Sequence, residues 1–309
     1  MNLFALPLND LLFKSIVIHQ KNFKGASIQL ASLISIKTGS CPEDCKYCPQ
    51  SAHFNVDLKK ESLIDFDQLR KAAINAKENG ADRFCMGAAW KKLRDGEDLD
   101  KVVNMIKLVK SLNLEACVTL GSITKEQAIE LKKAGLDAYN HNIDTSPEYY
   151  TKIITTRKFN ERLETIKNVR KAGIQVCSGG ILGMGESWSD RAKMLKILSD
   201  LSPQPESVPI NALVPVKGTP LENQKKLDPI EMLRVIATAR ILMPKSRIRL
   251  SAGRKEFSKE TQILCFMAGA NSIFYGNSLL TTDNNSMRED KELIASFSKS
   301  ESKINQNSL

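Results

Sequence analysis

The segment NAKENGADRFCMGAA, residues 75–89, joins the lysine-bearing end of a helix through a glycine to a short strand. The same order occurs three more times, at residues 108–121, 131–144 and 169–181. Glycine or asparagine just after a basic last turn is typical of a helix C-terminus. These helix stops fall at Gly80, Asn113, Gly135 and Gly173. Each interval between stops has room for one strand, one loop and one helix.

Four further strands are predicted at residues 33–39, 207–214, 247–253 and 271–276. Strands that alternate with helices along a chain favour a parallel sheet with the helices outside it. No glycine-rich dinucleotide turn opens the first unit, so we expect an α/β fold of the (β/α)8 TIM-barrel type rather than a doubly wound sheet. We expect one barrel domain over residues 1–309, with an N-terminal helical extension at 1–25 and a polar C-terminal tail at 286–309.

The chain of 309 residues carries 45 lysines and arginines against 35 aspartates and glutamates, a net charge of +10. Such an excess is one mark of a nucleic-acid-binding protein. Here the basic residues are spread along helix-like stretches such as ELKKAGL and NVRKAGI, with no long basic block. We interpret them as solvated helix faces that favour acidic partners, and we expect no nucleic-acid partner.

The N-terminal stretch MNLFALPLNDLLFKSIVIHQ is apolar but includes Asp10 and Lys14 and lacks a small-residue cleavage site. This pattern indicates an amphipathic helix rather than a signal peptide. No run of the sequence approaches the roughly 18 apolar residues that a membrane span needs. We therefore expect no membrane partner and a cytoplasmic location. In that compartment the seven cysteines indicate metal binding or catalysis before disulfides.

Several predicted strands carry polar residues on one face, because side chains two positions apart point the same way. The sets are Arg83 with Cys85; Glu115 with Cys117 and Thr119; Asn140 with Asn142 and Asp144; Gln175 with Cys177; and Arg247 with Arg249 and Ser251. A helix–sheet interface offers buried arginine and aspartate few partners, so we predict that these faces line the barrel interior. Cys85, Cys117 and Cys177 lie four or five residues after their helix stops and should converge at one height. Any one of them alone could instead be a packed core cysteine.

The loop CPEDCKYC, residues 41–48, holds three cysteines directly after the first predicted strand, where barrels of this type keep their active sites. Two kinds of metal centre fit the spacing. Zinc could be held in a closed Cys₃His site by Cys41, Cys45, Cys48 and His53. A 4Fe–4S cluster could use the three thiolates and leave one iron open. A structural zinc site would not explain the second cysteine set or the polar strand faces, so the open iron is favoured.

This loop, with Tyr47 before its last cysteine, resembles the cluster-binding loop of the radical S-adenosylmethionine enzymes. From about residue 5 to residue 285 the chain is also similar to the biotin synthase family. The segments that carry this resemblance are TGSCPEDCKYCPQSAHF, RFCMGAAW, EACVTLG, YNHNIDTSPEYY, VCSGGILGMGE, PESVPINALVPVKGTPL, RLSAGR and CFMAGANSIFYGNSLLTT. The three-cysteine loop alone specifies only the superfamily, whereas the whole set is specific to this member.

The resemblance implies a sulfurtransferase that converts dethiobiotin to biotin, with a 5′-deoxyadenosyl radical abstracting the hydrogens. A 4Fe–4S cluster, whose open iron binds S-adenosylmethionine, would be held by Cys41, Cys45 and Cys48. A 2Fe–2S cluster, the sulfur donor, would be held by Cys85, Cys117, Cys177 and Arg249. Because a guanidinium is normally protonated, the arginine would act partly through its charge.

The resemblance also implies the residues and partners around these clusters. S-adenosylmethionine would be bound by Tyr47, Asn142, Asp144, Arg162 and Gly180. Dethiobiotin would be bound by Asn140, Asn142, Asn211, Thr281 and Thr282. For Arg162, expected to pair with the methionine carboxylate, an ordinary role on a helix surface is the alternative. The expected partners are a second copy in a homodimer and a small acidic flavodoxin or ferredoxin as electron donor.

Two other functions stay open on the sequence. One is a radical S-adenosylmethionine enzyme with a different substrate. The other is a zinc-stabilised binding or scaffold protein, which metal analysis would distinguish from an iron–sulfur enzyme.

Overall fold

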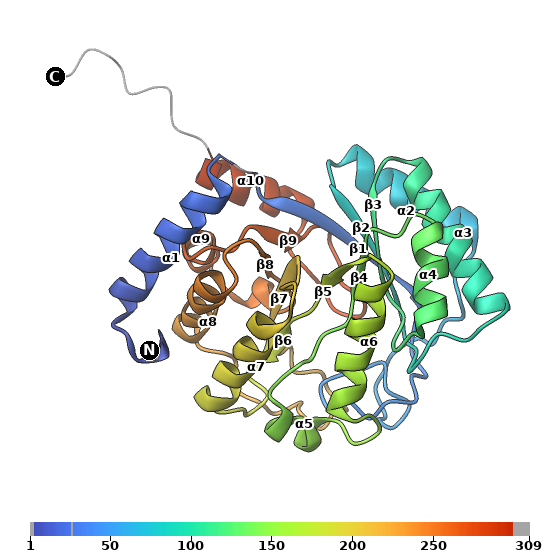
Figure 1. Ribbon diagram of the computed structural model, residues 1–309, viewed down its shortest axis with the longest axis horizontal. Coiled ribbons are helices and arrows are strands. Elements are labelled where there is room, and N and C mark those ends of the chain that lie inside the picture. The colour runs from blue at the N-terminus through green and yellow to red at the C-terminus, as the bar shows by residue number, and fades with distance from the viewer. Residues whose placement is uncertain (1–2, 26, 299–309) are drawn as a thin grey trace, which may run out of the picture.

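The computed structural model describes residues 3–25 and 27–298 and shows parallel strands ringed by helices (Figure 1). The strands in these residues are β1 Gln29–Lys37, β2 Arg83–Ala88, β3 Glu115–Thr119, β4 Ala138–Asn140, β5 Gln175–Cys177, β6 Gly180–Leu182, β7 Ser207–Ala212, β8 Arg247–Leu250 and β9 Ser272–Phe274. They form one parallel sheet in the order β5-β4-β3-β2-β1-β9-β8-β7-β6, and a pairing of β5 with β7 closes the ring. The (β/α)8 barrel is confirmed, with β5 and β6 as two pieces of one predicted strand.

Gly179 lies at the break between β5 and β6, where the chain approaches β7 closely. This residue lies so close to the carbonyl oxygen of Pro209 on β7 that a Cβ atom would clash with it. The Gly179 carbonyl also accepts hydrogen bonds from the backbone N–H groups of Ile143, at 3.1 Å, and Asp144, at 3.2 Å. The chain therefore leaves the regular ladder here and binds the loop after β4.

The helices lie outside the sheet (Figure 1). They are α2 Phe66–Glu78, α3 Glu97–Ser111, α4 Lys125–Lys133, α5 Pro147–Ile153, α6 Phe159–Lys171, α7 Trp188–Asp200, α8 Pro229–Leu242 and α9 Lys259–Met267, with the short 3₁₀ helix η2 Arg254–Glu256 after β8. All four predicted helix stops have left-handed backbones, with φ of 87°, 57°, 98° and 72° at Gly80, Asn113, Gly135 and Gly173. The helix C-termini were thus predicted from the correct chemistry.

Both ends of the described chain are helical. The predicted N-terminal extension is η1 Leu3–Ala5 followed by α1 Leu8–Phe23, which packs on α8. Residues 287–298, where we expected the start of a polar tail, form α10 Met287–Ser298. The remainder of that expected tail lies outside the described residues. No helix within 3–25 and 27–298 is long and apolar enough to cross a membrane.

The two faces of the strands differ as the period-two pattern predicts. On β2, Phe84 and Met86 belong to the main hydrophobic core beneath the helices. Cys85 instead belongs to a small interior group with Cys117, Ala31 and Ala138. Because the helix side carries the apolar core, the barrel interior is free to hold polar groups.

Candidate active site

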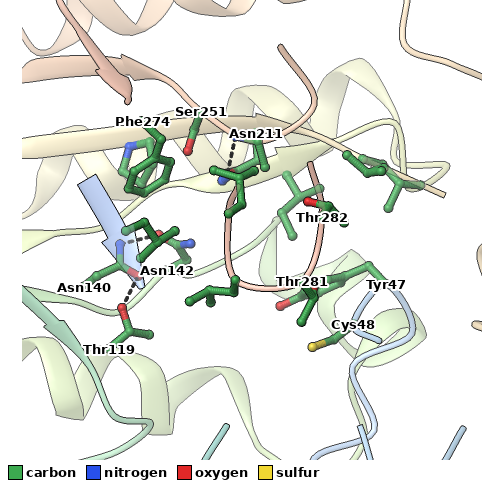
Figure 2. Close-up of a pocket in the computed structure, with 18 of the residues that line it drawn as sticks. Tyr47, Cys48, Thr119, Asn140, Asn142, Asn211, Ser251, Phe274, Thr281 and Thr282 are labelled. Atoms are coloured by element: carbon green, nitrogen blue, oxygen red, sulfur yellow. Dashed lines mark hydrogen bonds between the residues drawn. The ribbon is translucent and has the colours of Figure 1, made fainter. Parts of the chain in front are cut away.

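A cavity of about 270 Å³ lies at the carboxyl ends of the strands (Figure 2). Loops after β1, β7 and β9 complete its wall, and they include residues 47–50 after β1 and 279–282 after β9. The residues named from the sequence that line it are Tyr47, Cys48, Cys85, Cys117, Thr119, Asn140, Asn142, Asp144, Asn211, Arg249, Ser251, Thr281 and Thr282. The cavity lining does not include Cys41, Cys45, Cys177, Arg162 or Gly180.

Three thiols of the interior set are buried next to one another. Cys85 and Cys117 are paired across β2 and β3. The Cys177 Sγ accepts a hydrogen bond from Asn140 Nδ2 at 3.2 Å and lies 3.9 Å from Arg249 Nη1. A hydrogen bond from Cys117 lowers the pKa of the Cys85 thiol, and the charge of Arg249 lowers it further, against the opposing effect of burial. The predicted convergence of Cys85, Cys117 and Cys177 inside the barrel agrees with these contacts.

Two buried arginines flank these thiols. Arg249 donates from Nε to Ser272 Oγ at 2.9 Å, and its guanidinium lies 4.8 Å from the centre of the Phe274 ring. Arg83 donates from Nε to Glu115 Oε2 at 2.9 Å and from Nη2 to Gln175 Oε1 at 3.3 Å. The third guanidinium nitrogen of Arg83, Nη1, is buried and has no partner.

This donor set fits an anionic group held by the interior thiols. All the cysteines are free thiols, and the Nη1 atom of Arg83 is a buried donor that lacks an acceptor. A buried donor of this kind costs free energy unless a ligand satisfies it. A thiolate-ligated iron–sulfur cluster is negatively charged and would satisfy it.

The three-cysteine loop lies at the mouth of the cavity, with Cys48 in the wall. Burial raises the pKa of the Cys48 thiol to about 12 and also raises the pKa values of Cys41 and Cys45. The raised pKa values disfavour the thiolate form, so the iron of a bound cluster would have to stabilise the thiolates that it requires. The Nε2 atom of His53 lies 3.2 Å from the Pro42 carbonyl oxygen. Within the described residues, no three His, Cys, Asp or Glu side chains are arranged to hold a single metal ion, either at this loop or at the interior thiols. The geometry of the ligands therefore does not separate zinc from an iron–sulfur cluster.

A network of carboxylates anchors the cysteine loop, and sequence reasoning missed it. Asp44 accepts hydrogen bonds from the backbone N–H groups of Thr155, at 2.9 Å, and Thr156, at 3.1 Å. The Glu43 carboxylate is buried and pairs with Arg157, with Nη2 and Oε1 3.2 Å apart. Acidic residues between two cysteines that were predicted to ligate a metal were a signal in the sequence, but their partners lie more than a hundred residues away.

A second buried network fixes Asp144 at the cavity wall. Its Oδ2 atom accepts a hydrogen bond from Tyr47 Oη at 2.9 Å and lies 2.7 Å from Arg162 Nη2. Arg162 also donates from Nη1 to the Asn142 carbonyl at 2.9 Å and from Nε to Tyr150 Oη at 2.8 Å. Burial raises the pKa of Asp144, while Arg162 and Tyr47 oppose the rise. The helix-surface role considered for Arg162 is wrong, because its side chain is buried.

The amides of the cavity wall are held by specific partners (Figure 2). Asn140 accepts from Thr119 Oγ1 at 3.2 Å and donates to Asn142 Oδ1 at 3.3 Å. Asn211 donates to the Gly180 carbonyl at 2.9 Å. A Cβ at Gly180 would lie 2.6 Å from the Asp144 carbonyl oxygen. The glycine is therefore required by backbone packing behind the wall.

Two family profiles together cover most of the barrel. The profile of the Radical SAM superfamily matches residues 35–198, and that of the Biotin and Thiamin Synthesis associated domain matches residues 209–297. The fold and the three-cysteine loop thus define a radical S-adenosylmethionine protein. The chain belongs to the biotin synthase family. It is 57% identical over 290 residues to the biotin synthase of Prochlorococcus marinus (strain NATL2A), covering 94% of this chain and 84% of that protein.

Other relatives and solved structures agree with this placement. The biotin synthase of Hahella chejuensis is 58% identical over 292 residues, covering 94% of this chain and 82% of that protein. The biotin synthase of Ehrlichia canis is 55% identical over 295 residues, covering 96% of this chain and 91% of that protein. The crystal structure of methylornithine synthase (PylB) superposes with a TM-score of 0.81 at 19% identity, covering 96% of this chain and 89% of that one. That likeness supports the fold alone.

Proposed function

We propose that this chain makes biotin from dethiobiotin by radical S-adenosylmethionine sulfur insertion, with the barrel cavity as its active site. Membership of the biotin synthase family, a class of sulfurtransferases, supports the reaction. The single observation that carries the placement is that one cavity is lined by Cys48 of the loop and by Cys85 and Cys117 of the interior. When bound, the 4Fe–4S cluster supplies the electron that cleaves S-adenosylmethionine, and the 2Fe–2S cluster supplies the sulfur atom.

The chain's own residues divide into two proposed ligand sets. The ligands assigned to the 4Fe–4S cluster are Cys41, Cys45 and Cys48. The ligands assigned to the 2Fe–2S cluster are Cys85, Cys117, Cys177 and Arg249. The unpartnered Nη1 of Arg83 supports the second assignment, because it offers a hydrogen bond to an anion at the thiols. The three interior thiols are buried, which keeps water away and strengthens charge–charge interactions there, whereas Cys41 and Cys48 of the loop are partly exposed.

Dethiobiotin is proposed to bind along the cavity wall. The residues assigned to it are Asn140, Asn142, Asn211, Thr281 and Thr282. An amide offers both a donor and an acceptor, which a cyclic urea needs, and the threonine hydroxyls can donate to a carboxylate. Leu279 and Leu280 line the same wall and suit the apolar chain between these two ends.

S-adenosylmethionine is proposed to bind beside Tyr47, Asn142 and Asp144 at the cavity mouth. Arg162 and Gly180 would act from behind the wall, because neither lines the cavity. Arg162 then holds the Asp144 carboxylate instead of pairing with the methionine carboxylate. Gly180 lets the backbone of β6 approach Asp144.

We further propose an electron donor, an oligomeric state and a cellular location for the enzyme. The net charge of +10 supports a small acidic flavodoxin or ferredoxin as the electron donor. We propose a homodimer of single-domain barrels, with 1–25 as the N-terminal extension, acting in the cytoplasm.

The test of the function uses protein reconstituted with iron and sulfide without oxygen, a reductant, S-adenosylmethionine and dethiobiotin. We expect Cys117→Ala to keep S-adenosylmethionine cleavage but to make less than about one hundredth of the wild-type biotin, because the sulfur donor is lost. The Cys48→Ala variant should lose both activities. Cys265→Ala is the matched control, because Cys265 is equally buried but packs in the main core.

Three results would contradict the proposal. Biotin formation by Cys117→Ala at the wild-type level would reject the sulfur site. Cleavage of S-adenosylmethionine by the wild type without any biotin would indicate a different substrate. About one zinc per chain, and no iron, after oxygen-free purification would support a scaffold protein instead.

A further inference from the structure

The connection between β9 and α10 forms a hairpin that closes one side of the cavity. We define this hairpin loop as residues 277–284. Leu279 N donates to the Thr282 carbonyl at 2.8 Å, and Ser278 and Asp283 form an antiparallel bridge. Its tip, residues 279–282, lines the cavity, and Figure 2 shows Thr281 and Thr282 across the cavity from Asn140. The depth of the tip therefore decides the shape of the cavity.

The base of the hairpin loop is fastened by Asn284. Its side-chain Nδ2 donates to the carbonyl oxygens of Phe274, at 2.9 Å, and Gly276, at 2.8 Å. Its backbone N–H donates to the Asn277 carbonyl at 2.9 Å. The Phe274 carbonyl also accepts from Arg254 Nη2 at 2.9 Å. One backbone atom at the end of β9 thus joins the hairpin loop to the arginine.

Arg254 in turn holds α10 through a buried ion pair. Its Nη2 lies 2.6 Å from Asp290 Oδ2, and both side chains are 0% exposed. Nη1 donates to Gln262 Oε1 at 3.0 Å. The pair is incompletely satisfied, because Arg254 Nε and Asp290 Oδ1 are buried without partners. Such a pair contributes little net stability compared with apolar residues of the same size, so its value lies in fixing geometry.

The tip of the hairpin loop packs tightly against β2. A Cβ at Gly87 on β2 would lie 2.7 Å from Leu280 Cδ2. Gly87 is two positions after Cys85 on the same face of the strand. The hairpin loop is therefore clamped between β2 at its tip and the Arg254–Asp290 pair at its base.

We propose that Arg254 and Asp290 are positioning residues for the organic substrate, which they serve by holding the hairpin loop at the depth at which Thr281 and Thr282 reach it. Neither residue lines the cavity, and neither is catalytic. The inference rests on the proposed function for the identity of that substrate. The position of the hairpin loop itself does not depend on it.

The experiment compares Asp290→Asn, Arg254→Lys and Arg254→Met with the wild type in two ways. Amide hydrogen exchange of residues 277–284 is measured on the ligand-free full-length chain. Equilibrium binding of dethiobiotin and of S-adenosylmethionine is measured on the reconstituted enzyme. We expect Asp290→Asn to speed exchange in the hairpin loop and to weaken dethiobiotin binding by about tenfold, because only part of the population keeps a competent loop.

Comparing the binding of the two ligands in each variant distinguishes a positioning role from a general loss of stability. S-adenosylmethionine binding should stay within about twofold of the wild type. Arg254→Lys keeps the charge and should recover part of the dethiobiotin affinity, whereas Arg254→Met should not. Gly87→Ala leaves the ion pair intact, pushes Leu280 outward and should weaken dethiobiotin binding alone.

The matched control is Arg240→Met. Arg240 is also a fully buried arginine, but it donates to carbonyls such as that of Gly269, at the opposite end of the barrel. It should lower stability without changing exchange in the hairpin loop. Unchanged exchange in Asp290→Asn, or an equal loss of both ligands, would overturn the inference. Wild-type protein that fails to bind dethiobiotin would overturn the proposed function, and faster exchange in Asp290→Asn would then still support the anchoring.

Discussion

Asp44 lies between the first two cysteines of the loop. Its side chain anchors the loop to Thr155 and Thr156 and does not line the cavity. Burial alone would raise the pKa of its carboxyl, but hydrogen bonds from Thr155 and Thr156 lower it to about 2. The unfolded chain has the ordinary value of 3.8. The lowered pKa means that the ionised carboxylate stabilises the folded state, and that this stabilisation is present above the unfolded pKa.

At the residue scale we therefore expect a pH-dependent effect of Asp44→Asn. At pH 7 the variant should unfold more easily by on the order of 1 kcal/mol, a figure reduced for the partial exposure of the site. The difference from the wild type should shrink as the pH falls from about 4 toward 2, because the wild-type carboxylate becomes protonated as the pH approaches its folded-state pKa. Urea denaturation of the metal-free proteins measures it. A difference that is constant over this range would show that the charge of Asp44 has no part in the anchoring.

The residues that share a strand face were predictable, but their distant partners were not. Period-two spacing predicted the interior set that includes Cys85, Cys117 and Arg249. The pairing of Glu43 with Arg157 joins positions 114 residues apart, and no local pattern specifies it. Arg162 was predicted at the site, yet its burial behind Asp144 depends on how α6 packs on the barrel.

At the scale of elements, the interruption between β5 and β6 is another feature that local sequence patterns did not predict. The sequence predicts one strand there, because IQVCSGGI reads as continuous. At the break Gly179 lies close to Pro209 on β7, a contact that only the assembled sheet creates. The helix stops, in contrast, follow from residues within one turn and were predicted correctly.

This close approach predicts a large effect of Gly179→Ala. The added Cβ would clash with backbone that cannot give way, so the free energy of unfolding should fall by about 3 kcal/mol or more. Gly80→Ala is the matched control, because nothing lies within 4 Å of the added Cβ and only the left-handed backbone, at φ of +87°, opposes it. Its expected loss is about 1 kcal/mol. Equal losses in the two variants, measured by urea denaturation, would mean that the close contact with Pro209 adds nothing to the cost of an alanine at Gly179.

At the scale of the whole molecule, closure of the barrel brings two separate cysteine sets to one cavity. Cys48 reaches it from the mouth, on the loop after β1, while Cys85 and Cys117 reach it from the interior faces of β2 and β3. The hairpin loop after β9 closes the side between them. The alternation of strands and helices predicted this architecture, because it fixes the end of the barrel at which the loops gather.

The central claim is that the interior thiols hold the group that gives up its sulfur to the substrate. The most direct test is to reconstitute the protein anaerobically with iron and heavy-isotope sulfide, remove free sulfide, and supply S-adenosylmethionine, dethiobiotin and a reductant. Mass spectrometry of the biotin from a first turnover then reports the source of its sulfur. We predict heavy sulfur in the product of the wild type and no product from Cys85→Ala. Biotin with ordinary sulfur, or labelled biotin from Cys85→Ala in wild-type amount, would contradict the claim.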